Sequence, residues 1–146
     1  MSASASIVTP QDQGRALCVV GEHITLLAAS EAAGGHEIFL QAGPAGTGPV
    51  PHSHPWDESF YVTLGEVHFG IDCDLLVALP GTLVHLPAGT THWFRWGAGG
   101  GAMVSITSGR VASKMFTEID REIPADHQDV DKLIAICTRH GLRASA

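Results

Sequence analysis

The chain has 146 residues, of which 45% are hydrophobic and 16% charged, and its formal net charge is −7. This balance predicts one globular domain with a hydrophobic core and excludes an intrinsically disordered chain. The eight basic residues are scattered, which argues against nucleic acid as a partner. No apolar run approaches the roughly 20 residues of a membrane-spanning helix, so we expect no membrane partner.

The first residues, MSASASIVTPQDQG, lack the basic and apolar regions of a signal peptide and predict a flexible tail over 1–14. The three cysteines, Cys18, Cys73 and Cys137, lie far apart in the sequence. Their odd number favours reduced thiols over a disulfide framework. We therefore expect a soluble, cytoplasmic protein.

Glycine and proline divide most of the chain into short apolar segments, a pattern typical of many strands joined by turns. In one segment Phe60, Val62 and Leu64 alternate with polar residues, which predicts that these three side chains share one face. Residues 64–66 and 71–74 are predicted to form hairpin turns. Strands are predicted over residues 16–20, 23–29, 36–42, 58–64, 67–72, 75–79, 82–86, 92–96 and 102–107. Their density indicates an antiparallel sandwich or barrel.

The C-terminal segment carries the spacing of a helix instead of a strand. Apolar residues recur there at i, i+3, i+4 and i+7: Val130, Leu133, Ile134 and Cys137. Asp126 is the predicted N-cap, and Gly141 is placed to end the helix. We assign residues 15–120 to the barrel and 121–146 to a helix and tail that pack on the barrel or on a partner subunit.

The stretch HSHPWDE gathers two histidines and a glutamate at alternating positions. His52 and His54 project to the same side of an extended segment, and Glu58 shares their parity. His92 begins another predicted strand after the turn in PAGTTHWF. Three neutral imidazoles and one carboxylate suit one divalent transition metal ion: Fe, Mn, Ni, Co or Cu, with Zn at a lower coordination number. A structural zinc site would more often use thiolates.

Two stretches with fixed spacing resemble the two conserved motifs of the cupin superfamily. The first consists of Gly46, His52, His54, Glu58 and Gly65, and the second of Gly81, Pro87, Gly89 and His92. The chain departs from the second motif at Trp96, where the family often has asparagine. The resemblance covers roughly residues 15 to 142 and extends to small single-domain bacterial cupins similar to quercetin dioxygenases.

This resemblance implies an all-β fold, an antiparallel cupin (jelly-roll-like) β-barrel, here with a C-terminal α-helix. It implies that His52, His54, Glu58 and His92 bind the metal ion, and that Glu58 also acts as a catalytic base. Small cupins are commonly homodimers, so we expect a homodimer as well.

A substrate pocket is predicted beside the metal ligands. Phe60 and Val62 share the parity of Glu58, and Phe94 and Trp96 share that of His92. Phe39 and Met103 lie on strands that are expected to line the same barrel, as does Gln41. The alternative is that these side chains only pack the core, because aromatic residues fill barrels in any case.

The predicted function is a metal-dependent oxygenase that acts on a small aromatic or enolic substrate. The apolar pocket lacks the convergent Lys and Arg side chains that a sugar phosphate would need. Two alternatives stay open because cupins host many chemistries. One is a non-oxidative enzyme, an isomerase or polyketide cyclase, and the other is a non-catalytic module that binds a small molecule.

Overall fold

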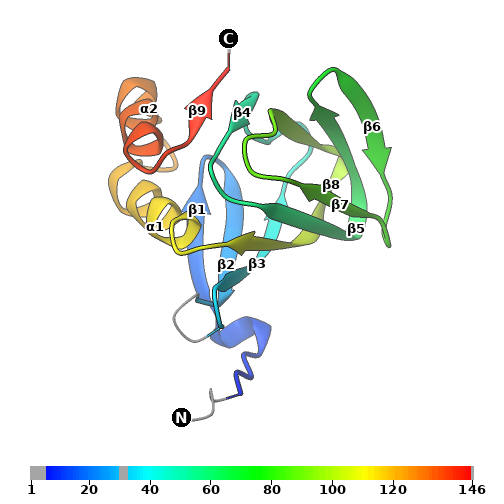
Figure 1. Ribbon diagram of the computed structural model, residues 1–146, viewed down its shortest axis with the longest axis horizontal. Helices are drawn as coiled ribbons and strands as arrows, with labels where there is room; N and C mark the ends of the chain where they lie inside the picture. The colour runs from blue at the N-terminus through cyan, green and yellow to red at the C-terminus, as the bar shows by residue number, and fades with distance from the viewer. Residues whose placement is uncertain (1–5, 30–32, 146) are drawn as a thin grey trace.

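The computed structural model describes residues 6–29 and 33–145 (Figure 1). Of the predicted tail over 1–14, residues 1–5 lie outside the described residues, and Gln11–Gln13 form a short 3-10 helix. The strands in the described residues are β1 (Arg15–Val19), β2 (Glu22–Ala28), β3 (His36–Gly43), β4 (His52–Ser53), β5 (Glu58–Ile71), β6 (Asp74–Ala78), β7 (Leu83–Leu86), β8 (His92–Ser108) and β9 (Arg143–Ala144). The helices are α1 (Ala112–Glu122) and α2 (Val130–Arg139).

Strand β8 connects the parts of the sheet. It pairs antiparallel with β3 and β4, and also with β5 along nearly its whole length. The strand order is β1-β2-β3-β8-β4-β9, and β5 adds β6 and β7. Because β5 and β8 are both long and bent, the sheet folds over on itself into a barrel (Figure 1). The expected all-β, antiparallel, jelly-roll-like fold with a C-terminal helix is confirmed.

In two places, a pair of predicted strands forms one continuous strand. The strands predicted at 92–96 and 102–107 are both part of β8. Residues 58–64 and 67–72 belong to β5, so the hairpin predicted at 64–66 is wrong. Gly65 instead takes a φ of 70° at a register shift, and a Cβ there would lie 2.2 Å from the carbonyl oxygen of Gly100. The bulge turns Leu64 outward, with 65% of its surface exposed, although it was predicted to face inward with Phe60 and Val62. The hairpin predicted at 71–74 is confirmed.

Helix α1 was not predicted, and it lies largely within the segment that we assigned to the barrel. Its N-terminus is held by the buried Glu37 of β3, whose Oε1 accepts a hydrogen bond from the backbone N–H of Ser113 at 2.9 Å. Met115 and Ile119 lie four residues apart on its buried face. That spacing was visible in the sequence, but two apolar residues four apart are too few to predict a helix.

Helix α2 begins later than predicted. Asp129, and not Asp126, is its N-cap, because Oδ1 of Asp129 accepts a hydrogen bond from the backbone N–H of Lys132 at 3.0 Å. Its buried residue is Ile136, whereas Ile134, which we placed on the packing stripe, is 50% exposed. The packing face is therefore rotated around the helix from the predicted one.

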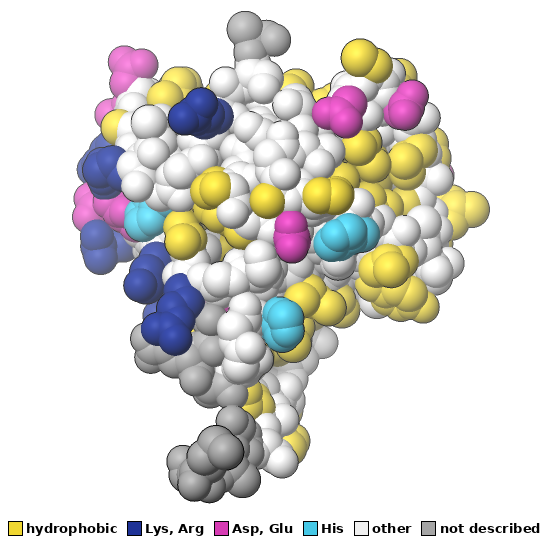
Figure 2. Space-filling view, in the orientation of Figure 1, with side chains coloured by type: hydrophobic (Ala, Val, Ile, Leu, Met, Phe, Trp, Pro, Cys, Tyr) yellow, Lys and Arg dark blue, Asp and Glu magenta, His cyan; other side chains and the backbone are white. Residues whose placement is uncertain are grey.

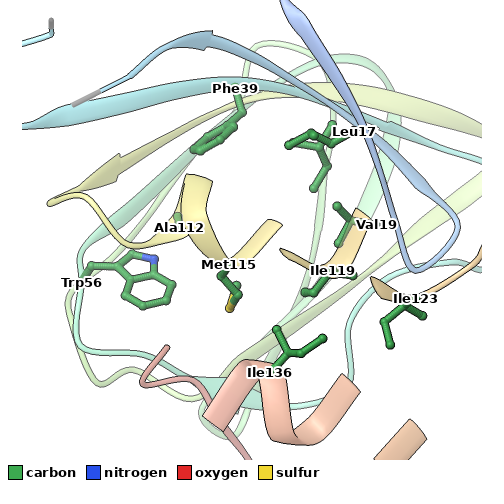
Figure 3. Close-up of a cluster of buried hydrophobic side chains, with 10 residues drawn as sticks. Leu17, Val19, Phe39, Trp56, Ala112, Met115, Ile119, Ile123 and Ile136 are labelled. Atoms are coloured by element: carbon green, nitrogen blue, oxygen red, sulfur yellow. The ribbon is translucent and has the colours of Figure 1, made fainter. Parts of the chain in front are cut away.

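The buried side chains form two hydrophobic clusters. The helix cluster joins β1 and β3 to both helices and includes Leu17, Phe39, Met115, Ile119 and Ile136 (Figure 3). The barrel cluster lies among β5, β6, β7 and β8 and includes Phe60, Val62, Phe69, Trp96 and Met103. The helices therefore close one side of the barrel with a core of their own.

Hydrophobic side chains gather on the outer surface over β5, β6 and β7 (Figure 2). Exposed residues there include Tyr61, Leu75, Val77 and Leu83. Such a face would suit contact with a second copy, but the homodimer stays a prediction. Within the described ranges, neither helix has the length and apolar character that crossing a membrane requires.

We predict that Ile136→Ala destabilises the protein by about 2–5 kcal/mol, because it removes the buried side chain that joins α2 to the helix cluster. The matched control is Ile134→Ala, which deletes the same atoms from the same helix at a half-exposed position and should cost far less. Urea unfolding of both variants measures the difference. Equal losses would contradict the packing of α2 described above.

Candidate metal centre

Three histidines from two segments of the barrel converge on one point. In the antiparallel ladder between β4 and β8, His52 is directly opposite His92, and His54 follows one residue after β4. The imidazole centroids of His52 and His92 are 4.3 Å apart, and those of His54 and His92 are 5.0 Å apart. All three side chains are buried, and one nitrogen from each lies within 4.8 Å of the other two. The predicted convergence of these residues is therefore present in the fold.

Each imidazole is oriented by a backbone carbonyl group. Nδ1 bonds to a carbonyl oxygen in His52 (to Val50, 2.7 Å), His54 (to Trp56, 2.9 Å) and His92 (to Thr90, 2.9 Å). A carbonyl oxygen only accepts hydrogen bonds, so Nδ1 carries the proton in all three rings. In the neutral imidazole this leaves a lone pair on Nε2, which is the arrangement found in metal-binding histidines.

Burial favours the neutral form of two of these imidazoles. It lowers the pKa of His52 to about 4, and the neighbouring His92 acts in the same direction. Burial also lowers the pKa of His54, although Glu58 opposes the shift. A neutral imidazole is the form that binds a metal ion.

Two of the Nε2 atoms, in His54 and His92, are buried and have no hydrogen-bond partner among the described residues. An unsatisfied buried polar atom costs roughly 1–3 kcal/mol, so the fold accepts a cost that a bound ion would relieve. The donor set therefore fits a divalent transition metal ion, and the cluster of His52, His54 and His92 could bind one.

Glu58 begins β5 and lies beside two of the histidines. Its Oε1 is 3.9 Å from Nε2 of His54 and 3.8 Å from Nε2 of His92. The carboxylate is buried, and it faces the same centre as the imidazoles. Its position is compatible with a fourth ligand, which stays a prediction, as does its role as a base.

A cavity of about 210 Å³ opens beside these residues, with His52, His54 and Glu58 in its wall. The two helices supply another part of the wall through Met115, Phe116, Ile119, Leu133 and Cys137. The volume is below the roughly 300–1,000 Å³ of pockets for drug-sized ligands, so a small ligand is expected. The helix wall was not foreseen, because the C-terminal helix was expected only to pack outside the barrel or on a partner.

The six predicted pocket residues lie in three different places in the structure. Phe94, two residues after His92, lines the cavity. Four others are in the barrel cluster and not in the cavity wall: Phe60, Val62, Trp96 and Met103. Phe39 packs edge-on against Phe116 in the helix cluster, with the ring centroids 5.4 Å apart. Strand parity identified inward-facing residues, but it carried no information on their depth in the barrel.

Glu22, which was not predicted as a site residue, also lines the cavity and is only 6% exposed. Its Oε1 accepts a hydrogen bond from Nε1 of Trp96 at 3.1 Å. Burial raises the pKa of this carboxyl group to about 7; the nearby Glu58 adds to the shift, while Trp96 and Arg95 oppose it. The available signal was one acidic residue at the edge of the apolar stretch VVGEHITLL.

We predict that Glu22 lowers the stability of the metal-free protein as the pH rises from about 4.5 to about 7. Below this window the carboxyl group is protonated in both the folded and unfolded chains, so it contributes nothing. Above it the group must ionise in a buried position, at a cost on the order of 3 kcal/mol.

The measurement is the free energy of unfolding against pH for the parent and for Glu22→Gln, both treated with chelator. The variant should gain stability relative to the parent as the pH rises through the window. Comparing the two cancels the opposite contribution of His52, whose pKa is lowered. Parallel profiles would contradict the raised pKa of Glu22.

Comparison with known proteins identifies a known domain within this chain. A model of the cupin domain matches residues 38–107, which include the three histidines and Glu58. A search of curated proteins found no match.

Several solved structures share the fold at low sequence identity. KdgF from Halomonas sp. is 18% identical, with a TM-score of 0.65, and the match covers 73% of this chain and 97% of that one. An RmlC-like cupin from Shewanella frigidimarina is 17% identical, with a TM-score of 0.67, over 75% of this chain and 96% of that one. The polyketide cyclase RemF from Streptomyces resistomycificus is 15% identical, with a TM-score of 0.64, over 71% and 80% respectively. The domain match assigns residues 38–107 to a cupin domain, and these solved structures share its fold.

Proposed function

We propose that the chain is a divalent-metal-dependent enzyme that acts on a small aromatic or enolic substrate, with an oxygenase reaction as the first candidate. The observation that carries the proposal is the cluster of three buried imidazoles, two of which have buried and unpartnered Nε2 atoms. His52, His54, His92 and Glu58 would hold the ion. When bound, the ion supplies Lewis-acid chemistry that lowers the pKa of a substrate hydroxyl group, and a redox-active ion also permits reaction with dioxygen.

The cavity supports the choice of substrate class. Its wall is mainly apolar, with Phe94 near the histidines and the aliphatic residues of α1 and α2 beyond them. Its volume of about 210 Å³ suits a single ring or a short enol better than a large ligand. The mainly apolar wall lowers the local polarity and so strengthens the electrostatic interactions of any group within the cavity.

Glu58 is the proposed base of this reaction. It is buried, and its Oε1 lies within 3.9 Å of Nε2 in both His54 and His92, two of the atoms that would hold the ion. If it left the ion transiently, its carboxylate could accept a proton from a substrate hydroxyl or from the carbon next to a carbonyl group. A general base must lie within reach of the proton that it removes.

A non-oxidative reaction, an isomerisation or cyclisation, is the second candidate. It is favoured by Glu22, a second buried carboxyl group in the same cavity. Such reactions need one group to remove a proton and another to return it. One protein of similar fold is named as a polyketide cyclase, which agrees with this candidate but shows only the likeness of the folds.

We predict that the parent binds about one equivalent of a divalent transition metal, and that His92→Ala lowers its affinity for the metal at least tenfold. The physical reason is the loss of an oriented, buried ligand. His85→Ala is the control, since His85 is exposed and bonded to Ser59 away from the centre. The measurement is metal content by mass spectrometry after reconstitution with Fe, Mn, Ni, Co, Cu or Zn. An absence of bound metal in the parent would contradict the proposal.

We further predict oxygen consumption by the reconstituted protein with a small phenol or enol, for which catechol and acetylacetone are suitable first substrates. An oxygen electrode measures the rate, and His92→Ala should abolish it. Product formation without dioxygen would instead support the isomerase or cyclase. Binding without any turnover across such substrates would leave a module that binds a small molecule.

A further inference from the structure

Two polar side chains share one patch of the cavity wall, on neighbouring strands. Glu22 begins β2 and Gln41 lies in β3, and both line the cavity. The register pairs Ile24 with Gln41, and Glu22 is two residues before Ile24 in an alternating strand. The two side chains are therefore diagonal neighbours on one face of the sheet. They are 6% and 5% exposed, which is rare for a carboxyl and an amide group in a mainly apolar wall.

The position of Glu22 is built into the fold. Nε1 of Trp96 donates a buried hydrogen bond to its Oε1 at 3.1 Å. The indole fits only because residue 43 is glycine, since a Cβ at Gly43 would lie 2.4 Å from Nε1 of Trp96. Trp96 occupies the position where the chain departs from the second cupin motif. The device that holds Glu22 is therefore a feature of this chain.

Gln41 adds an acceptor without a partner. Its Oε1 is buried and makes no hydrogen bond to any of the described residues. Buried polar atoms normally have partners, so this oxygen calls for a donor from a molecule in the cavity. Glu22 can accept a second hydrogen bond, because the described residues give its Oε2 none.

The charges around the patch disfavour an anion. None of the described residues in the cavity wall is a lysine or an arginine. The positive charge of Arg95 acts on Glu22, but its guanidinium group donates hydrogen bonds to the carbonyl oxygens of Pro49, at 2.6 Å, and Phe94, at 2.8 Å. The carboxylate of Glu58 acts on Glu22 with negative charge, and Cys137 of α2 contributes a thiol whose pKa burial raises.

We propose that Glu22 and Gln41 form a subsite that recognises a neutral hydroxyl group on a small aromatic or enolic ligand and selects against a carboxylate. The hydroxyl group donates to one of the two acceptors and can accept from Glu22 when that carboxyl group is protonated. The proposal rests on the proposed function for its ligand class, but binding at the subsite does not require the metal ion.

The test compares phenol with toluene, which has the same shape but carries a methyl group in place of the hydroxyl, and with benzoate as the anionic probe. Chemical-shift titrations of the full chain, freed of metal by chelation, give the three dissociation constants and locate each probe. In the parent, phenol should shift signals of the cavity wall, and benzoate should bind at least tenfold more weakly than phenol.

Substitutions then locate the discrimination. The dissociation constant of phenol divided by that of toluene should rise at least tenfold in Glu22→Leu and in Gln41→Leu, because each variant loses an acceptor for the hydroxyl group. Trp96→Phe keeps the ring but removes the N–H group that holds Glu22, so it should move the ratio in the same direction by a smaller factor. The control Glu66→Gln, at a half-exposed position outside the cavity wall, should leave the ratio within about twofold of the parent.

Three outcomes would overturn the proposal: an unchanged ratio in both leucine variants, phenol signals outside the cavity, or benzoate that binds as tightly as phenol. The last two need only the parent, so they decide the matter even if a leucine variant fails to fold. Because the protein is free of metal, a failed metal or turnover experiment leaves this result intact. Conversely, if the parent does not distinguish phenol from toluene but still binds the metal, the subsite proposal is wrong and the proposed function stands.

Discussion

The pairing of β8 with three different strands is the constraint on which the rest of the structure depends. Its first residue, His92, is opposite His52 of β4, and its second half lies between β3 and β5. Opposed residues in an antiparallel ladder bring their side chains within about 5 Å, so the backbone register itself sets the separation of the imidazoles. The same strand carries Phe94 into the cavity and Trp96 under Glu22. A shift of one residue in this register would turn all three side chains away from the site.

The helices add the second constraint, which is enclosure. Without α1 and α2 the cavity would lose the wall made by Met115, Ile119 and Leu133. Enclosure in apolar surroundings disfavours charge, and it does so for groups of both kinds. Burial lowers the pKa of His52 and raises that of Glu22, so neutral imidazoles and a carboxyl group that titrates near neutral pH share one space. The same low polarity makes each remaining polar atom matter, which is why the unpartnered Oε1 of Gln41 is informative.

Much of the fold was predictable because strand alternation and turn residues are local signals. The predictions failed where one local sequence pattern is compatible with two different structures. Gly65 looks like the centre of a hairpin, but its positive φ serves a bulge within a continuous strand, because β8 continues beside it as the partner. Met115 and Ile119 have helical spacing, but α1 is anchored by Glu37, a residue distant in the sequence. Asp126 and Asp129 are both acceptable caps by type, and only in the fold does Asp129 accept the capping hydrogen bond from Lys132.

The sequence by itself determined the fold class and brought the histidine pattern to attention, because the spacing of His52, His54, Glu58 and His92 and the alternation of apolar residues are properties of short segments. Only the tertiary structure decided what surrounds that centre. Alternation assigns a side chain to a face of a strand but not to a depth, so Phe60 and Met103 proved to lie in the barrel cluster while Phe94 lines the cavity. The meeting of Glu22 with Trp96, and of both helices with the metal centre, depends on contacts between distant segments. Such contacts follow from strand register and from the packing of the whole core, which no local pattern encodes.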